Sequence, residues 1–478
     1  MTTRYRLHID GEDRDAHDGG VLPVFDPCRG LTVAEVAAAT PDDVEDAVAA
    51  AHRAFPAWAA LRPSERGRWL QRLADALEAE AAAFAALESA DTGKPLALCR
   101  EIEIPRAVAN LRFFAAAAST FASEAHHGEA GLNLTLRLPL GVVATISPWN
   151  LPLYLFTWKL APALAAGNTV VAKPSEITPA SASAFMQLAR RIGLPRGVLN
   201  LVQGAGPVAG EALVRHPGVR AVSFTGSTAV GRRIGALCGE QLKKCSLELG
   251  GKNALLAGED VDTAPVAELV LRSAFQNAGQ ICLCNSRLLV PRGRLEEWRF
   301  ALATAIGDWV AGPPSDASAR LGPLASQAQF DKVRGYLALA RAEGGRVVAE
   351  GRIAASADPA GWFVAPVLLE GLGAASRCAN EEIFGPVLSL HPYDDEAEAV
   401  ALANATPYGL AATVLTHDLG RAQRLAAALD VGLVWVNTWM QRDLRTPFGG
   451  ARQSGLGREG GWEAMRFFTE ARNVCLGT

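Results

Sequence analysis

The motif best suited to covalent chemistry ends in two cysteines, Cys282 and Cys284, which follow a Gly-Gln turn. A cysteine in such a turn can be exposed and activated as a nucleophile. A Cys-x-Cys pair supplies only two metal ligands, and the other cysteines and the eight histidines show no zinc-type spacing, so no metal site is expected. Cys282 is therefore the candidate nucleophile. Cys284 is either a packing residue or an oxidation partner, and both interpretations stay open.

A carboxylate and an amide could assist this thiol. Glu248 lies in the apolar motif Leu247-Glu-Leu-Gly-Gly-Lys252, where burial of an ionised side chain would be costly. It should face a polar cleft or have a raised pKa, which suits a general base; a buried ion pair is the alternative. Asn150 ends the motif Ser-Pro-Trp-Asn and could donate its side-chain N–H to a developing oxyanion.

Three loops that follow apolar runs could bind a dinucleotide. The motif Lys173-Pro-Ser-Glu176 offers a carboxylate to ribose hydroxyls, and Phe224-Thr-Gly-Ser227 begins a helix whose free amides suit a pyrophosphate. Gly206 belongs to a third, glycine-rich turn. None of the three has the usual G-x-G-x-x-G spacing, so each alone could be a turn without a ligand. Three of them at successive strand ends favour dinucleotide binding.

The elements that must position these groups alternate between strands and helices. Five apolar runs have the length of buried strands: 141–146, 168–172, 197–202, 219–224 and 245–249. Helix-length segments separate them, which predicts a doubly wound parallel sheet with ligands at the carboxyl ends of the strands. A second alternating series over 253–436 predicts a second α/β domain. Leucines at every second position over 132–138 predict a strand or hairpin arm outside the main sheet.

Composition restricts the class of protein. The chain has 478 residues, 49% of them hydrophobic, and a formal net charge of −4, which excludes a disordered chain and gives no basic surface for nucleic acid or anionic membrane. Its eight cysteines are scattered, which excludes a small disulfide framework and favours reduced thiols. No secretory signal and no apolar run of about 20 residues is present, so we expect a cytoplasmic protein with no membrane or nucleic-acid partner.

Seven motifs together resemble the aldehyde dehydrogenase superfamily, from about residue 5 to the C-terminus. In order they begin at Pro148, Lys173, Phe224, Leu247, Phe275, Glu382 and Pro447. The resemblance implies that an aldehyde is oxidised to a carboxylic acid with NAD. Cys282 would form a thiohemiacetal and then a thioester, Asn150 and the Cys282 backbone N–H would hold the oxyanion, and Glu248 would activate the hydrolytic water.

The resemblance also implies a cofactor site. Lys173 and Glu176 would hold the adenosine ribose, with Glu176 favouring NAD over NADP, and Ser227 would meet the pyrophosphate. Glu382 and Phe384 would position the nicotinamide ribose and ring. The full set of expected cofactor-binding residues is Ile146, Ser147, Pro148, Trp149, Lys173, Ser175, Glu176, Gly206, Phe224, Thr225, Gly226, Ser227, Leu249, Glu382 and Phe384.

The fold that the resemblance implies has three parts. A doubly wound, Rossmann-like NAD-binding domain would comprise residues 1–119 and 140–250, and a second α/β catalytic domain residues 251–445. A small β arm and C-terminal tail, residues 120–139 and 446–478, would mediate assembly. A homodimer or homotetramer is expected, with a small-molecule aldehyde as the substrate.

A narrower resemblance connects the chain to 2-aminomuconate and 2-hydroxymuconate semialdehyde dehydrogenases, enzymes of tryptophan and aromatic-ring catabolism. It lies in the segments 104–114, 282–287, 437–448 and 467–475. A semialdehyde with a carboxylate would need a guanidinium opposite the reacting end. We predict that Arg106 and Arg442 bind substrate, with Arg445 and Arg112 as substitutes. Structural ion pairs are the alternative role for these arginines.

Three other functions fit parts of the sequence. An aldehyde dehydrogenase that acylates coenzyme A usually lacks the water-activating carboxylate, so Glu248 argues against it. An enzyme for uncharged aromatic, aliphatic or betaine aldehydes would use the same chemistry without the arginines. A non-enzymatic descendant of the family should have lost the thiol or the base, and this chain keeps both.

Overall fold

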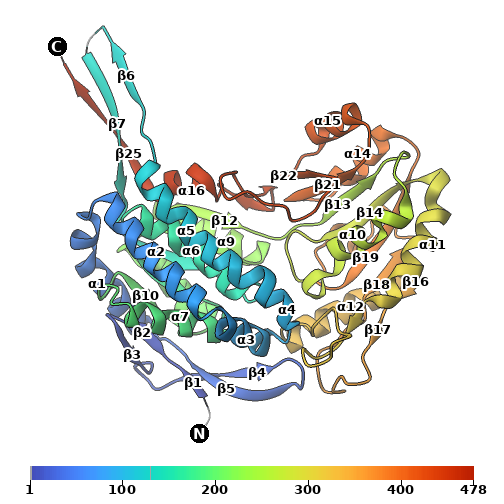
Figure 1. Cartoon of the computed structure of the whole chain (residues 1–478), viewed down its shortest axis with the longest axis horizontal. Helices are drawn as coiled ribbons and strands as arrows, with labels where there is room; N and C mark the ends of the chain where they lie inside the picture. The colour runs from blue at the N-terminus through green and yellow to red at the C-terminus, as the bar shows by residue number, and fades with distance from the viewer. Residues whose placement is uncertain (1–2, 130, 478) are drawn as a thin grey trace.

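Two α/β sheets and a three-stranded arm make up the computed structural model, which describes residues 3–129 and 131–477 (Figure 1). The two sheets and their helices lie side by side, and the arm projects from the side of the first sheet. All eight cysteines are free thiols. Among the described residues, no helix combines the length and the apolar character that crossing a membrane requires.

The first sheet has eight strands, and its five central strands are parallel. In spatial order these are β12 (Lys244–Glu248), β11 (Val219–Thr225), β8 (Val142–Ile146), β9 (Thr169–Lys173) and β10 (Leu199–Leu201). The antiparallel strands at its edges are β24 (Gly455–Leu456), beside β12, and β2 (Leu7–Ile9) with β3 (Glu12–Arg14), beside β10. The five central strands arise from the five apolar runs, so the predicted doubly wound parallel sheet is confirmed.

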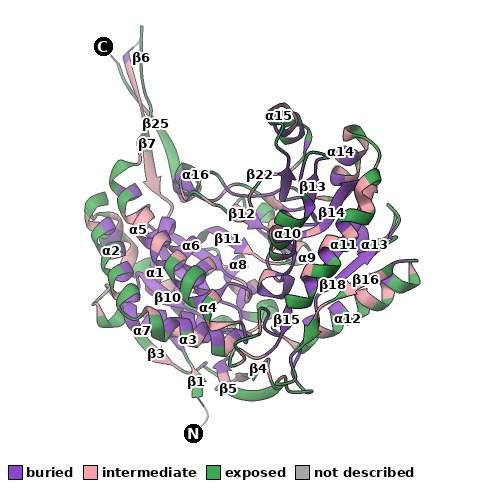
Figure 2. Ribbon diagram, turned by 45° about the vertical axis from the view of Figure 1, so that its right-hand side comes forward, coloured by how far each residue is buried: buried purple, intermediate pink, exposed green. Residues whose placement is uncertain are grey.

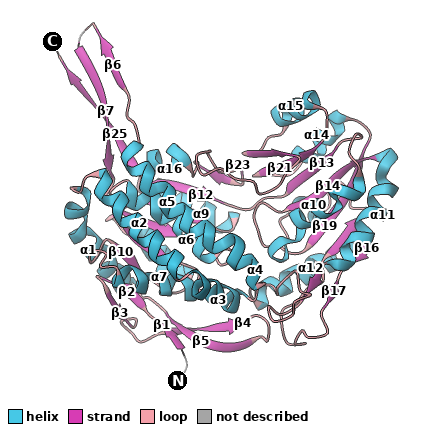
Figure 3. Ribbon diagram, viewed as in Figure 1, coloured by secondary structure: helices cyan, strands magenta, loops and turns pink. Residues whose placement is uncertain are grey.

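Helices cover both faces of this sheet. One face carries α2 (Pro63–Ala79), α5 (Ile104–Thr120), α6 (Pro152–Ala165) and α7 (Ala180–Arg191); the other carries α1 (Pro41–Ala59), α8 (Glu211–Arg215) and α9 (Thr228–Glu240). The helices α2, α5 and α6 lie side by side (Figure 3). Because side chains alternate along a strand, Val143 joins the first core and Val142 and Ala144 join the second.

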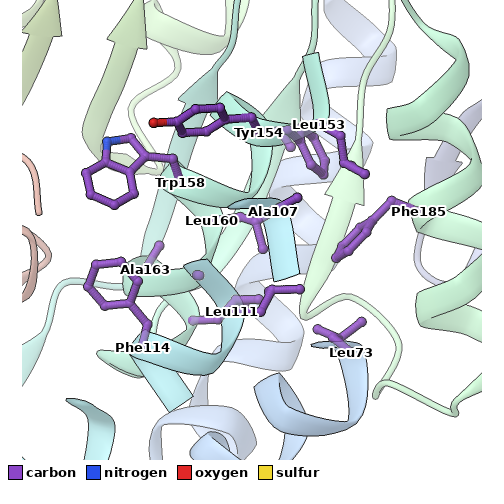
Figure 4. Packing of buried hydrophobic residues seen from close by; sticks show 14 of the residues in the cluster. Leu73, Ala107, Leu111, Phe114, Leu153, Tyr154, Trp158, Leu160, Ala163 and Phe185 are labelled. Carbon is purple, nitrogen blue, oxygen red and sulfur yellow. The ribbon is translucent and has the colours of Figure 1, made fainter. Parts of the chain in front are cut away.

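Large apolar side chains fill the first core. Figure 4 shows Leu73, Leu111 and Phe114 packed beside residues of α6.

On the other face of the sheet, α1 begins at a capping box, since Thr40 accepts from the Asp43 N–H and the Asp43 carboxylate accepts from the Thr40 N–H. The strands between the two layers of helices are buried (Figure 2).

The second sheet has seven strands, parallel except at one edge. In order they are β16 (Arg346–Glu350), β18 (Val367–Glu370), β19 (Val387–Tyr393), β14 (Asn285–Pro291), β13 (Asn253–Ala257), β21 (Ala411–Leu415) and β22 (Leu433–Val436), with β16 antiparallel. Its helices are α10 (Thr263–Phe275), α11 (Leu295–Ala305), α12 (Gln327–Ala342), α14 (Glu396–Asn404) and α15 (Leu419–Ala428). The predicted second α/β unit is therefore present.

The arm consists of β6 (Ala125–Gly128), β7 (Gly131–Pro139) and β25 (Thr469–Leu476), with β7 in the middle. Between the second sheet and the arm, the chain forms β24 and then α16 (Gly461–Phe467). The predicted tail of residues 446–478 is thus divided: Ala451–Arg452 pairs with Tyr408–Gly409 of the second unit, β24 belongs to the first sheet and β25 belongs to the arm.

The remaining elements are short or peripheral. They are the sheet of β1 (Thr3–Tyr5), β5 (Leu31–Ala37) and β4 (Val21–Asp26), the pairs β15 (Val310–Ala311) with β17 (Arg352–Ile353) and β20 (Tyr408–Gly409) with β23 (Ala451–Arg452), and the helices α3 (Ala81–Thr92), α4 (Leu96–Leu98) and α13 (Arg377–Asn380).

Candidate active site

A pocket of about 200 Å³ lies where loops of the first sheet meet loops of the second unit. It is lined by Pro148, Trp149, Asn150, Thr225, Gly226, Ser227, Leu249, Gly250, Cys282, Gln329, Lys332, Glu382 and Phe384. All of these except Gly250, Gln329 and Lys332 are residues that the sequence predicts as catalytic or cofactor-binding. Motifs that are up to 236 residues apart in the chain, from Pro148 to Phe384, therefore meet in one pocket.

The first-sheet side of this pocket is built by strand ends. The strands β12, β11 and β8 are neighbours and parallel, so the loops after them emerge at one edge. Lys173 ends β9 at the same edge, and its Nζ lies 3.2 Å from Glu176 Oε2. The hydroxyl of Ser175 accepts a hydrogen bond from the Ile177 N–H.

Other predicted cofactor residues lie near this edge without lining the pocket. Ile146 and Phe224 are buried within β8 and β11, and the Ser147 N–H donates to the Lys173 carbonyl at 3.1 Å. Gly206 is exposed and begins the turn after β10, with no atom within 4 Å of where a β-carbon would stand. The open surface at Gly206 leaves space for a ligand against the backbone.

The loop that carries Cys282 has an unusual backbone. Asn277 and Ala278 adopt left-handed conformations, with φ of 55° and 54°. A β-carbon at Gly279 would stand 2.1 Å from the Gly385 carbonyl oxygen, so only glycine allows this contact between the two motifs. Asn253 also holds this loop, because its Nδ2 donates to the Cys282 carbonyl at 2.7 Å.

The two thiols of this loop have different surroundings. Cys282 is half-buried and lines the pocket, whereas Cys284 is buried and its thiol donates to the Gln276 carbonyl at 3.8 Å. Burial, together with the carboxylates of Glu382 and Glu248, raises the pKa of Cys282 to about 12, and Arg442 opposes this rise. The Cys282 thiol is therefore protonated at neutral pH and must lose its proton when it attacks.

Glu248 ends β12 and is 3% exposed. Neither carboxylate oxygen has a hydrogen-bond partner among the described residues. The backbone of Gly449, with φ of 153°, approaches so closely that a β-carbon there would stand 2.8 Å from Oε1. Burial raises the pKa of Glu248 well above its usual value, and Glu459 raises it further. Once it is ionised, an unpaired carboxylate of this kind can accept a proton from water.

Hydrogen bonds hold both the side chain and the backbone carbonyl of Asn150. Its side-chain Nδ2 donates to the Gln280 carbonyl at 2.8 Å. Its own carbonyl accepts from Lys94 Nζ at 2.7 Å and from Asn277 Nδ2 at 3.0 Å. Because a carboxamide has two N–H groups, one remains available to an oxygen in the pocket.

The second unit closes the pocket with Glu382 and Phe384. Glu382 Oε1 accepts from the Gly251 N–H at 2.9 Å, and burial raises the pKa of this carboxyl. Phe384 has a left-handed φ of 59°, and its ring meets that of Trp149 edge-on, with 5.5 Å between centroids.

Two polar lining residues come from α12 and are absent from the sequence predictions. Gln329 Nε2 donates to the Phe384 carbonyl at 2.7 Å. The charge of Lys332 opposes the rise that burial causes in the pKa of Glu382. A glutamine on the buried face of an amphipathic helix, followed by a lysine one turn later, is the signal that could have identified them.

Arg106 and Arg442 flank the buried side chain of Tyr154. Arg442 Nη1 donates to the Tyr154 hydroxyl at 2.9 Å, and its Cζ lies 3.9 Å from the centroid of the Phe448 ring. Arg106 Cζ lies 5.6 Å from the centroid of the Tyr154 ring, and its buried Nε and Nη2 have no hydrogen-bond partner in the described part of the chain. Figure 4 shows Tyr154 and Trp158 projecting together from α6.

The other two arginines considered for substrate binding have carboxylate partners. Arg445 pairs with Asp443, and Arg112 pairs with Glu78 and Asp75 at the surface. The ion-pair role therefore applies to Arg445 and Arg112. Burial lowers the pKa of Arg106, and the neighbouring charge of Arg442 lowers it further, so an anion between the two guanidiniums would relieve their repulsion.

Known proteins share both the sequence and the architecture. Residues 14–474 match the aldehyde dehydrogenase family. The chain is 46% identical over 461 residues to 2-aminomuconic semialdehyde dehydrogenase of Bos taurus (95% of each chain). It is 42% identical over 477 residues to 2-hydroxymuconic semialdehyde dehydrogenase of Pseudomonas sp. strain CF600 (98% of each chain).

Solved structures agree with these relatives. PnpE of Pseudomonas sp. WBC-3 superposes with a TM-score of 0.96 at 41% identity, with 100% of this chain and 98% of PnpE covered, and one PnpE structure is a complex with nicotinamide adenine dinucleotide. With nearly the whole length matched and five of the seven motifs lining one pocket, the chain belongs to the aldehyde dehydrogenase family.

Proposed function

We propose that this chain oxidises a carboxylate-bearing semialdehyde to a dicarboxylic acid with NAD, the substrate class being that of 2-aminomuconate and 2-hydroxymuconate semialdehydes. The observation that carries the substrate class is the pair of guanidiniums, Arg106 and Arg442, beside Tyr154. Both are at least half-buried and neither is paired with a described carboxylate. Relatives named for these two substrates support the proposal.

The residues present fit a dinucleotide. Ser227 caps α9 at the pocket edge, and the first turn of this 13-residue helix is exposed at Ala229 and Val230, so the helix dipole there favours a pyrophosphate. The hydroxyl of Thr225 is buried without a described partner. Glu176 and Glu382 are the carboxylates that we assign to the two riboses. When bound, NAD supplies the acceptor for the hydride that leaves the substrate carbon.

The first half of the reaction takes place at Cys282. Cys282 attacks as its thiolate, after the thiol proton has passed to solvent, and as the sulfur bonds to the aldehyde carbon the carbonyl oxygen becomes the anionic oxygen of a thiohemiacetal. The free N–H of the Asn150 carboxamide and the backbone N–H of Cys282 stabilise this oxygen. Loss of hydride from the carbon converts the adduct to a thioester.

The second half is hydrolysis of the thioester. Glu248 accepts a proton from water while the water oxygen attacks the thioester carbon. The carbon–sulfur bond then breaks, the carboxylic acid leaves, and the proton that Glu248 took from the water returns to the Cys282 sulfur, which restores both the thiol and the base. A coenzyme-A-acylating enzyme would not need this base.

Removal of one guanidinium should separate acidic from neutral substrates. We expect Arg442→Met to lower kcat/KM on 2-hydroxymuconate semialdehyde by about 10- to 100-fold, because one charged hydrogen bond to a carboxylate is worth about 1.5–3 kcal/mol. With hexanal, which has no carboxylate, kcat/KM should stay within about twofold of the wild type. Initial rates of NADH formation measure both.

The matched control for this variant is Arg445→Met, which removes an exposed arginine already paired with Asp443. It should leave both substrates unaffected. An equal loss on hexanal and on the acidic substrate in Arg442→Met would contradict the carboxylate site and favour an enzyme for uncharged aldehydes.

Glu176 should determine the choice between NAD and NADP. A carboxylate that accepts from the ribose hydroxyls repels a 2′-phosphate. We expect Glu176→Gln to raise kcat/KM for NADP about tenfold relative to NAD, since removal of a like-charge contact is worth at least about 1.4 kcal/mol. Titration of each cofactor at saturating aldehyde measures the ratio. An unchanged ratio, equal to that of the distant control Glu240→Gln, would contradict the assignment.

We also propose the assembly, domain division and location that the resemblance implies. The arm of β6, β7 and β25 would join copies of the chain into a homodimer or homotetramer. Its strands lie within the ranges 120–139 and 446–478, and, apart from β24, the strands of the two sheets lie within 1–119 with 140–250 and within 251–445, which supports the division. A reducing cytoplasm suits a mechanism that needs a free Cys282.

A further inference from the structure

We propose that Lys94 is a positioning residue for aldehyde oxidation, because it holds the peptide from which the Asn150 carboxamide reaches the pocket. This inference rests on the proposed function, in which Asn150 stabilises the thiohemiacetal oxygen. Lys94 itself does not line the pocket and belongs to no motif that the sequence analysis singles out.

The ammonium of Lys94 is buried between two acceptors. The residue is 3% exposed, and its Nζ lies 2.7 Å from Glu103 Oε1 and 2.7 Å from the Asn150 carbonyl oxygen. Hydrogen bonds from a charged donor are shorter and stronger than neutral ones. The Lys94 ammonium, a charged donor, therefore holds the Asn150 carbonyl more firmly than a neutral donor would.

A glycine turn aims Lys94 inward. Helix α3 ends at Thr92, and Gly93 follows with a left-handed φ of 71°. A β-carbon at Gly93 would stand 2.4 Å from Pro323 Cγ, so this turn requires glycine. The Ser89 hydroxyl donates to the Lys94 carbonyl at 2.7 Å and fixes the residue after the turn.

The partner carboxylate comes from a local irregularity in a helix. A π-helix at Cys99–Glu103 separates α4 from α5, and such turns are frequent at functional sites. It places Glu103, which is fully buried, against Lys94. The π-helix continues directly into α5, which carries Arg106 three residues after Glu103. The oxyanion donor Asn150 and the proposed carboxylate site are therefore both connected to this π-helix.

A second buried carboxylate holds the other end of the same segment. Glu88 is fully buried, and its Oε1 accepts from the Leu153 N–H at 2.7 Å. Lys94 therefore fixes the link between β8 and α6 at Asn150, and Glu88 fixes the first turn of α6 at Leu153.

A purely structural need would not require a charge here. Asn277 Nδ2 already donates to the Asn150 carbonyl at 3.0 Å, so this acceptor would be satisfied without Lys94. Burial of an ammonium and its carboxylate partner is costly, and neutral side chains often replace such pairs without loss of stability. What the pair adds is a fixed geometry next to the reacting atoms, where small displacements slow a reaction strongly.

The test uses a reaction of Cys282 that needs no cofactor. An activated ester such as p-nitrophenyl acetate acylates a cysteine nucleophile through an oxyanion, and the initial burst of p-nitrophenolate measures that step. The test variant is Lys94→Met/Glu103→Gln, which removes the two charges of the ion pair together. We expect its acylation rate to fall about tenfold. The acylation rate of Asn150→Ala should fall about 100-fold. The triple variant Lys94→Met/Glu103→Gln/Asn150→Ala should acylate no more slowly than Asn150→Ala.

Three measurements separate positioning from a general structural effect. Circular dichroism establishes that each variant is folded. Alkylation of Cys282 by iodoacetamide, which forms no oxyanion, should keep its wild-type rate. Lys243→Met is the matched control, because Lys243 Nζ also donates to two main-chain carbonyls, those of Val214 and His216, away from the pocket. It should acylate at the wild-type rate.

Two outcomes would overturn the role of Lys94 alone: wild-type acylation in the folded pair variant, or effects of the pair variant and Asn150→Ala that multiply. Wild-type acylation in Asn150→Ala would instead overturn the oxyanion role of Asn150, and with it this inference. If the pair variant does not fold, Lys94→Gln/Glu103→Gln, which keeps a hydrogen-bond donor at both positions, is held to the same expected result.

Discussion

Cys282→Ala should abolish NADH formation with every aldehyde, acidic or neutral, while the chain stays folded. Cys282 is the half-buried thiol in a pocket that also contains Asn150 and Glu382, and among the described residues no other cysteine lines this pocket. Without a nucleophile neither the thiohemiacetal nor the thioester can form, so we expect the rate to fall by at least about 10⁴-fold. Steady-state NADH formation at fixed NAD measures the loss, and thermal denaturation monitors folding.

The control for this variant is Cys284→Ala. The Cys284 thiol is buried and directed at the Gln276 carbonyl, so its removal should leave most of the activity. The comparison also tests the role that the sequence leaves open, because an oxidation partner would make the wild type, but not Cys284→Ala, lose activity reversibly in peroxide. Full NAD-dependent activity in Cys282→Ala would rule out the nucleophile assignment.

The thiol's pKa gives an independent signature. Because burial and two carboxylates hold the pKa of Cys282 near 12, only a small fraction is thiolate at neutral pH, and that fraction increases with pH. Alkylation by iodoacetamide without cofactor should therefore accelerate steadily from neutral to alkaline pH, and the site should be unlabelled in Cys282→Ala.

The sequence predicts the fold and the pocket well because both follow from local patterns. Apolar runs as long as a buried strand indicate the five parallel strands, and parallel strands place the residues after β8, β9, β11 and β12 at one edge. Trp149 and Ser227 consequently meet, although the chain separates them widely, and the loop before β14 of the second sheet brings Cys282 to the same pocket.

What the sequence does not predict depends on contacts between distant segments. Arg106 and Arg112 lie on the same helix, but only Arg112 finds carboxylates, on α2. Gln329 and Lys332 line the pocket only because α12 packs beside the loop of Glu382 and Phe384. Lys94 gains its contact to Asn150 through a glycine turn and a π-helix, neither of which has a distinctive sequence pattern.

The surroundings of Glu248 are another long-range effect. Lys159 Nζ lies 2.7 Å from Glu459 Oε1, which also accepts from the Ser223 hydroxyl. Burial raises the pKa of Glu248 most, the charge of Glu459 raises it further, and Lys159 and Arg458 lower it. The base therefore remains a protonated carboxyl until the pH exceeds its raised pKa.

Glu248→Gln should separate the two halves of the reaction. Glutamine keeps the shape of the side chain but cannot accept a proton, so we expect about one equivalent of NADH per site to form rapidly and further turnover to fall by about 10²- to 10⁴-fold. Stopped-flow measurement of NADH gives the burst and the steady state in one experiment. Mass spectrometry of the quenched enzyme should show the acyl group on Cys282.

The pH dependence supplies the control for this assignment. A base acts only when it is deprotonated, so hydrolysis by the wild type should be slow below the raised pKa of Glu248 and should increase as the pH rises through it. That limb should be missing from the steady-state rate of Glu248→Gln, while its burst keeps the pH dependence of the Cys282 step. An unchanged steady-state rate in the variant would overturn the base assignment. If the acyl-enzyme also stalled in the wild type, and coenzyme A released it while water did not, the result would favour acyl transfer over hydrolysis.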